Sequence, residues 1–247
     1  MLRWATELGR VDILTEVSVL SQCQAAPREG HLEEVLHIFG FLKKVGKLTL
    51  WFDPSTPNWP TELESVRSED FLEHCRDAEE LMPPDAPPPL GKPVDLTAHV
   101  DASHAANKVT RRSHIGHILF VQRAPIIWCS KRTATVESSA FSSEFLAMKT
   151  RIEHLKALRH KLRMFGVPVD NPTKVHCDDK SVVTNCTKFE STLNKKHNSI
   201  ARHLTRWAVA AKEVTIHWIH TKVNFVDAMT KFLPEAARQR LFGEWTC

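Results

Sequence analysis

The chain has 247 residues, of which 42% are hydrophobic and 25% charged, as in an ordinary globular protein of one or two domains. It has no run of 18 apolar residues, which argues against a membrane span. It has no C-x-x-C pair among its six cysteines, so neither a zinc site nor a disulfide scaffold is suggested. Residues 1–97 carry 9 basic and 17 acidic side chains, whereas residues 98–247 carry 24 basic and 12 acidic ones. The basic second part suits a polyanionic partner. A solvated basic surface would have the same composition.

The first 81 residues are predicted to form a small, mostly helical segment. The start of the chain contains acidic residues and no long apolar core, so we do not expect a secretory signal; with the scattered cysteines this favours reduced thiols in an intracellular setting. Residues 31–47 have helical periodicity and a stop at Gly46. The expected buried side of this helix consists of Leu32, Val35, Leu36, Phe39, Leu42 and Val45. Residues 61–80 are acidic and compatible with another helix.

A proline-rich stretch, residues 82–93, separates this segment from the rest of the chain. Its proline density excludes helix and favours an extended, semi-rigid linker. We therefore divide the chain into a segment at 1–81, a linker at 82–93 and a domain at 94–247.

After the linker the pattern becomes that of an α/β domain. Residues 94–101 alternate between apolar and polar side chains, as in a strand. Residues 116–122 and 124–130 predict two more strands, joined by a short turn, so the first three strands should form an antiparallel meander. A long helix follows, up to about Phe165. Its inward face is predicted to carry Met148, Ile152, Leu155, Leu158, Leu162 and Phe165.

Strands and helices then alternate to the end of the domain. Two further strands are predicted at 173–178 and 213–220, with helices between them and a final helix that begins near Val226. Strands separated by helices add in parallel. The expected architecture is a mixed five-stranded sheet, with three antiparallel strands and then parallel additions, flanked by helices.

Four carboxylates lie at the ends of these predicted elements. Asp101 and Asp178 end strands, Asp227 lies at the start of the last helix, and Glu144 falls on the inward face of the long helix. Strand carboxyl ends and helix N-termini gather at one edge of such a sheet, so the four acids are expected to meet. Clustered anions repel unless cations lie between them, and Mg²⁺ or Mn²⁺ suits oxygen ligands. Two such ions about 3.5–4 Å apart are typical of in-line attack on a phosphodiester.

Each acid also has a structural interpretation. A single aspartate at a strand end is usually a turn or cap residue, and Asp227 can simply complement the positive end of a helix. Glu144 is harder to explain in this way, because an inward acid without compensation is rare. The set of four in this order is more specific than any member.

The sequence around the acids resembles a known family, the ribonuclease H domain of copia-type LTR retrotransposons. The resemblance rests on Asp101-Ala-Ser, Glu144-Phe-Leu-Ala, Cys177-Asp178-Asp179-Lys-Ser and Asn224-Phe-Val-Asp227-Ala-Met-Thr-Lys231, and it extends over residues 94–243. Residues 1–60 are similar to the tail of the reverse transcriptase in the same family. The polymerase's own paired aspartates belong further upstream and are not in this chain.

The resemblance implies a ribonuclease H-like fold and hydrolysis of the RNA strand of RNA–DNA hybrids during reverse transcription, by a two-metal-ion mechanism. Asp101, Glu144, Asp178 and Asp227 would be the catalytic metal ligands, with Mg²⁺ or Mn²⁺ as cofactor. The implied partners are the hybrid and a reverse transcriptase polymerase domain. The implied location is intracellular, in cytoplasmic retroelement particles and the nucleus.

Three positions depart from the family's usual pattern. Ser142 replaces a second glutamate, Phe145 replaces a tyrosine and Asp179 replaces an asparagine. The first two changes look tolerable. Asp179 adds negative charge beside the third acid, and we expect it to affect metal affinity.

Other residues have weaker predicted roles. His220 would assist product release or pack at a strand end, and Asn224 would touch the hybrid or cap the last helix. Ser103 and Ser143, next to two of the acids, are candidates for reading 2′-hydroxyls. The predicted phosphate contacts, each with a solvated surface as the alternative, are Arg111, Arg112, Lys195, Lys196, His197 and Arg202.

Two other functions remain open from the sequence. One is a catalytically inactive ribonuclease H-like scaffold that binds nucleic acid or protein. The other is a related DNA-cutting or integrase-type nuclease, which usually has three acids and lacks the Ala-x-x-Thr-Lys sequence after the last one.

Overall fold

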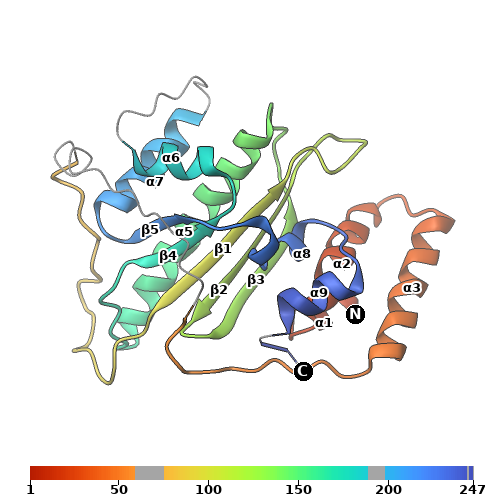
Figure 1. Ribbon diagram of the computed structural model, residues 1–247, viewed down its shortest axis with the longest axis horizontal. Helices are drawn as coiled ribbons and strands as arrows, with labels where there is room; N and C mark the ends of the chain where they lie inside the picture. The colour runs from red at the N-terminus through yellow and green to blue at the C-terminus, as the bar shows by residue number, and fades with distance from the viewer. Residues whose placement is uncertain (59–74, 189–197, 244, 247) are drawn as a thin grey trace.

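The protein is built around a five-stranded sheet with the strand order β3-β2-β1-β4-β5 (Figure 1). The structure, a computed structural model, describes residues 1–58, 75–188, 198–243 and 245–246. Strands β1 to β3 pair antiparallel, and β4 and β5 are parallel to β1. The strands are β1 (Leu96–Ser103), β2 (His114–Val121), β3 (Ala124–Arg132), β4 (Thr173–Cys177) and β5 (Val214–Trp218). The predicted α/β fold, with its mixed sheet, is confirmed.

The helices follow the predicted order, with one difference at the end of the chain. Those of the sheet domain are α5 (Ala140–Met164), α6 (Lys180–Thr187), α7 (Ser199–Ala210), the short 3₁₀ helix η4 (Thr221–Val223), α8 (Asp227–Thr230) and α9 (Glu235–Phe242). The expected single last helix is divided into α8 and α9. Lys231 is extended and Pro234, which has no N–H donor for a continuing helix, is the N-cap of α9.

Helices cover both faces of the sheet (Figure 1). One core lies between the sheet and α5, α6 and α7, and includes Val100, Val175 and Ile216. The other contains Phe120 of β2 together with Met229 and Leu241 from α8 and α9. β1 is therefore buried on both faces. The polar side of its alternating pattern faces the interior and not solvent.

The N-terminal segment packs against the second face of the sheet. It contains α1 (Leu2–Glu7), η1 (Val11–Ile13), α2 (Leu14–Leu20), η2 (Ser21–Cys23) and α3 (Glu29–Val45). Val11 and Leu14 belong to the same core as Phe120, and Trp128 Nε1 donates to the Thr6 carbonyl at 2.7 Å. Thr15 Oγ1 donates to the Ala228 carbonyl at 2.8 Å. The segment and the sheet domain thus share a hydrophobic core, while the boundaries at 81 and 94 stay predictions.

The predicted buried side of α3 is largely wrong, although Leu42 packs against the core around Ile38 as predicted. Leu32, Leu36 and Phe39 are 60%, 59% and 46% exposed, whereas the buried residue is Ile38. Apolar residues occupy more than one side of this helix, and the side that packs is set by contact with α2, which periodicity alone does not reveal. The predicted stop is confirmed, because Gly46 caps the helix with a φ of 72° that favours glycine.

The inward face of α5 is also only partly as predicted. Met148, Ile152 and Leu155 are buried, but Phe165 is largely exposed. Two arginines of α5, Arg151 and Arg159, are fully buried. None of the described helices combines the length and apolar character needed to cross a membrane.

Residues 82–93 form neither helix nor strand, as the proline content predicts. They nevertheless contact the sheet domain, because Leu90 N donates to the Gly166 carbonyl at 2.8 Å. Directly after the linker, Val94 N donates to the Pro168 carbonyl at 3.0 Å. Just before the linker, Glu80 forms ion pairs with Arg159 and Arg163 of α5. Most of the acidic helix predicted at 61–80 lies outside the described residues.

Candidate metal centre

The four predicted acids come from four different elements. Asp101 lies near the end of β1, Asp178 directly follows β4, Glu144 is in the second turn of α5, and Asp227 begins α8. Because β1 and β4 are parallel neighbours, their carboxyl ends lie at the same edge of the sheet. The fold thus brings residues that are far apart in sequence to one place.

The carboxylates lie close together. One oxygen each from Asp101, Asp178 and Asp227 falls within 4.8 Å of the others. Glu144 and Asp178 form a second such group with the Cys177 thiol, a residue that the sequence did not predict. Burial, with a contribution from Glu144, raises the pKa of the Cys177 thiol well above its usual value, so it stays protonated at neutral pH.

Hydrogen bonds from other elements orient three of the four carboxylates. Thr230 Oγ1 donates to Asp101 Oδ2, and Ala102 N donates to Glu144 Oε1 at 3.1 Å. Asp178 Oδ2 accepts a hydrogen bond from Thr221 Oγ1 at 2.8 Å. The backbone carbonyl of Asp178 accepts one from Trp218 Nε1 at 2.9 Å. The acids are therefore held in place by the protein itself.

Burial and mutual repulsion raise the pKa of two of the acids. Burial raises the pKa of Asp101 to about 6. The charge of Lys231 opposes this rise, whereas the charges of Asp178 and Asp227 add to it. Burial, together with the charges of Asp101 and Asp178, raises the pKa of Glu144 to about 10. Without a metal ion, Glu144 therefore holds a proton at neutral pH.

The site suits a hard divalent cation. The Glu144 Oε2 atom is buried and has no hydrogen-bond partner among the described residues. A cation would provide that partner, favour loss of the Glu144 proton and relieve the repulsion among the carboxylates. The ligands are almost all carboxylate oxygens, which Mg²⁺ and Mn²⁺ prefer. The residues present thus fit the predicted cofactor class.

Gly116 permits the close approach of α8 to the sheet. It is the β2 partner of Asp101, and a Cβ atom there would lie 2.6 Å from Val226 Cγ1 and 2.8 Å from Thr230 Cγ2. Those distances are too short for any side chain. The absence of a Cβ at Gly116 lets Asp227 and Thr230 reach Asp101.

Replacing Gly116 with valine should destabilise the protein by about 1–3 kcal/mol, because the added methyl groups push α8 away from β2. Urea unfolding of the wild type and the variant measures this change. Gly30→Ala is the matched control: a Cβ at that α3 position meets nothing within 4 Å, so it should be neutral or slightly stabilising. Equal stabilities of Gly116→Val and wild type would contradict the packing role.

His220 and Asn224 have local structural contacts. His220 is exposed, and its Nδ1 accepts from Lys222 N at 3.1 Å, which caps η4. Asn224 is fully buried and donates to the Val100 carbonyl at 3.0 Å. Its burial argues against contact with nucleic acid, and it does not cap α8, whose N-cap is Val226 without a side-chain hydrogen bond. Asn224 instead ties the loop before α8 to β1.

The predicted nucleic-acid contact of Ser143 is not supported. Ser143 is fully buried, and its hydroxyl hydrogen-bonds His104 Nδ1 at 2.9 Å and Ser113 Oγ at 2.7 Å. Three consecutive polar positions, 142 to 144, all point inward at the start of α5. The hydroxyl thus braces the helix next to Glu144.

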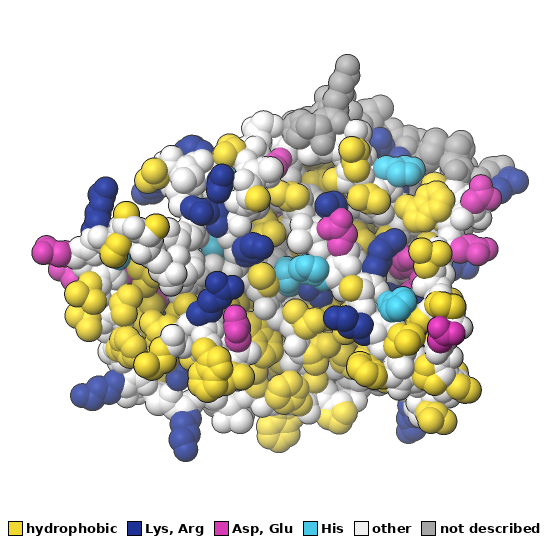
Figure 2. Space-filling model, turned by 180° about the vertical axis from the view of Figure 1, so that it is seen from behind, with side chains coloured by type: hydrophobic (Ala, Val, Ile, Leu, Met, Phe, Trp, Pro, Cys, Tyr) yellow, Lys and Arg dark blue, Asp and Glu magenta, His cyan; other side chains and the backbone are white. Residues whose placement is uncertain are grey.

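The other predicted nucleic-acid contacts stay predictions. Arg111 is exposed in the β1–β2 loop, and Arg112 and Arg202 are half-buried. Lys195, Lys196 and His197 lie outside the described residues. On the face of the molecule shown in Figure 2, Lys and Arg side chains are interspersed with apolar and acidic ones. This face has no single continuous basic patch in its described part.

Two departures from the family pattern have structural roles. Asp179 is the N-cap of α6, where Oδ1 accepts from Ser181 N at 2.7 Å and Val182 N at 3.1 Å. Asn and Asp are equally good at this position. Ser142 is buried, and its Oγ accepts from Asn198 Nδ2 at 3.0 Å.

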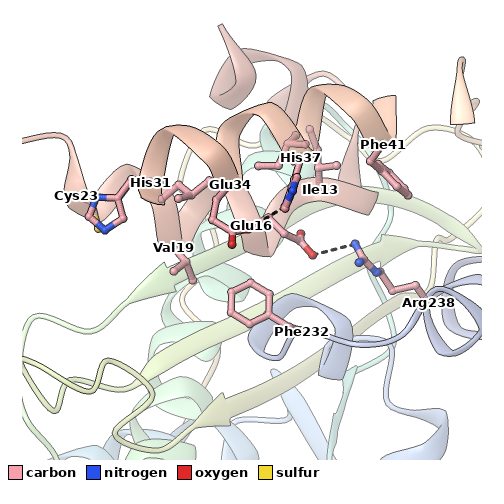
Figure 3. A pocket seen from close by; sticks show the side chains of 12 residues that line it. Ile13, Glu16, Val19, Cys23, His31, Glu34, His37, Phe41, Phe232 and Arg238 are labelled. Atoms are coloured by element: carbon pink, nitrogen blue, oxygen red, sulfur yellow. Dashed lines mark ion pairs between the residues drawn. The ribbon is translucent and has the colours of Figure 1, made fainter. Parts of the chain in front are cut away.

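A hollow lies away from the acids, between α2 and α3 (Figure 3). It has a volume of about 540 Å³ and a mainly apolar lining that includes Ile13, Ile38 and Phe232. Glu16 and Arg238 form an ion pair of 2.9 Å at its side. It contributes no group to the metal centre.

Comparisons with known proteins connect the chain to transposons. It is 24% identical over 230 residues to the retrovirus-related Pol polyprotein from transposon RE1 of Arabidopsis thaliana. The matched residues make up 93% of this chain and 13% of that protein. It is also 24% identical over 149 residues to the corresponding polyprotein from transposon RE2 of the same plant, 60% of this chain and 10% of that protein. The chain thus spans a small part of these relatives. No family model matches it.

Solved ribonuclease H structures resemble part of the chain at low identity. LC11-RNase H1 in complex with an RNA/DNA hybrid is 14% identical, with 55% of this chain and 93% of that chain covered and a TM-score of 0.44. RNase H1 from Halobacterium salinarum is 15% identical with the same coverage and a TM-score of 0.42. Likeness at this level assigns no function. By its sequence matches, the chain is similar to the Pol polyproteins of retrovirus-related transposons, and its structure has an α/β fold with a mixed five-stranded sheet.

Proposed function

We propose that this protein is a metal-dependent ribonuclease H that cuts the RNA strand of RNA–DNA hybrids. The observation that carries the proposal is the convergence of Asp101, Asp178 and Asp227 within 4.8 Å, with Glu144 beside Asp178. The relationship to transposon Pol polyproteins supports a substrate that arises during reverse transcription. A reverse transcriptase polymerase domain, which makes such hybrids, is the proposed partner.

In this proposal Asp101, Glu144, Asp178 and Asp227 hold the cofactor. Two divalent ions would supply a water of lowered pKa and stabilise the leaving oxygen. Thr230, Thr221 and the Ala102 amide keep the carboxylates oriented before substrate arrives. Water adds to phosphorus and gives up a proton, the bond from phosphorus to O3′ breaks, and O3′ takes up a proton. The products are a 3′-hydroxyl and a 5′-phosphate.

The proposal predicts strand-selective, metal-dependent cleavage. With Mg²⁺, the full chain should cut the labelled RNA strand of an RNA–DNA hybrid, and EDTA should abolish the cleavage. The DNA strand of the same hybrid and a DNA duplex are the matched controls. Denaturing gels measure all four reactions. Binding of the hybrid without cleavage would indicate the inactive scaffold, and cleavage of the DNA duplex alone would indicate the integrase-type nuclease.

A further inference from the structure

Lys231 places a positive charge inside the acidic cluster. The residue directly follows α8, and its backbone N donates to the Asp227 carbonyl at 3.1 Å. Its side chain turns back toward the acids: Nζ contacts Asp227 Oδ1 and lies 3.7 Å from Asp101 Oδ2. The ammonium group thus bridges two of the three aspartates whose oxygens converge.

The surroundings of Lys231 differ from those of its partners. Its side chain is 40% exposed, whereas those of Asp101 and Asp227 are 2% and 15% exposed. Both acids are largely buried and Asp101 also accepts a hydrogen bond from Thr230, whereas the lysine is partly exposed on a flexible stem. Movement of the lysine into water therefore breaks few contacts, whereas movement of the acids would disturb the core.

The position of the ammonium conflicts with occupation by a metal. Lys231 contacts the carboxylates of Asp101 and Asp227, two of the three residues that each offer an oxygen to the group within 4.8 Å. A divalent cation bound by those carboxylates would be close to the ammonium and would repel it. Lysine and metal are therefore alternative partners for the same carboxylates.

We propose that Lys231 is a built-in counter-ion, which neutralises the acidic cluster in the metal-free protein and leaves it when a divalent ion binds. This inference rests on the proposed function, since it assumes that the acids bind metal. Lys231 is a positioning residue: it keeps Asp101 and Asp227 together before the metal arrives, and it lowers metal affinity by competition.

Metal titration of a variant tests the competition directly. Isothermal titration calorimetry with Mg²⁺ should show that Lys231→Met binds about tenfold more tightly than the wild type, since removal of a nearby positive charge favours a cation. The melting temperature of metal-free Lys231→Met should be lower than that of the wild type, and the increase caused by Mg²⁺ should be larger. Lys222→Met, at an exposed lysine of the same segment, is the control and should bind like the wild type.

A measurement on the wild-type protein gives a second test, should the variant not fold. Acylation by an amine-reactive ester, followed by peptide mass spectrometry, reports how accessible each lysine is. Addition of Mg²⁺ should increase acylation of Lys231 severalfold and leave that of Lys222 unchanged.

The outcomes separate this inference from the proposed function. Mg²⁺ binding of equal or lower affinity in Lys231→Met, or acylation of Lys231 that Mg²⁺ does not increase, overturns the counter-ion role alone. Failure of the wild type to bind Mg²⁺ overturns the proposed metal centre and the counter-ion role with it.

Discussion

Replacing Glu144 with glutamine should reduce hybrid cleavage by about 10²–10³-fold or more while the metal-free protein stays about as stable as the wild type. Glu144 is protonated at neutral pH without metal, because burial and the neighbouring aspartates raise its pKa to about 10. A neutral amide of the same shape therefore costs little in the metal-free fold. It cannot become the carboxylate ligand, so the metal-dependent reaction fails.

Cleavage rates and metal-free melting temperatures of the two proteins measure both parts of this expectation. Glu153→Gln is the matched control, because it makes the same change on an exposed turn of α5, where Glu153 pairs with Lys149. It should retain wild-type cleavage. Asp101→Asn should lose cleavage as Glu144→Gln does. Wild-type rates in Glu144→Gln would rule out its role as a metal ligand.

Replacing Glu80 with alanine should lower the free energy of unfolding by about 3–5 kcal/mol, the usual cost of breaking a buried ion pair. Glu80 accepts from Arg159 Nε at 2.7 Å and from Arg163 Nη2 at 2.8 Å. The Arg159 side chain is 2% exposed, so loss of Glu80 leaves a buried guanidinium without its counter-charge. Urea unfolding at neutral pH measures the effect. Glu79→Ala, at the exposed neighbouring acid, should change stability little.

The same ion cluster should give a specific dependence on pH. Although burial alone would raise the pKa of Glu80, hydrogen bonds and ion pairs with Arg159 and Arg163 lower it from its ordinary value of 4.5 to about 2. The folded protein therefore binds this proton less tightly than the unfolded chain. The contribution of Glu80 is fully present above about pH 4.5 and is lost as the pH falls toward 2. The stability difference between wild type and Glu80→Ala should shrink over that range, and a constant difference would contradict the assignment.

The sequence was sufficient to predict the strands of the sheet and the positions of the four acids at the ends of elements. Both depend on local pattern and chain order. Alternation and helical periodicity located the strands and α5. The strand ends located Asp101 and Asp178. The mismatch between a charge and an apolar stripe identified Glu144.

Features that depend on tertiary contacts were not predictable in this way. The apolar residues Leu32, Leu36 and Phe39 of α3 are exposed because another side of the helix contacts α2. Arg159 is buried because it pairs with Glu80, 79 residues away in the sequence. Three adjacent polar residues at the start of α5 gave no sign that Ser143 would face His104 and Ser113. Gly116 and Lys231 acquire their roles only when α8 lies against β2.

The most direct test of the metal centre is an anomalous difference map from crystals of the full chain grown with Mn²⁺. We expect manganese peaks bonded to carboxylate oxygens of Asp101, Asp178 and Asp227, with Glu144 as a further ligand and the Lys231 ammonium moved away from them. A map in which saturating Mn²⁺ gives no peak among these side chains would contradict the idea that four distant acids are gathered to bind a divalent ion.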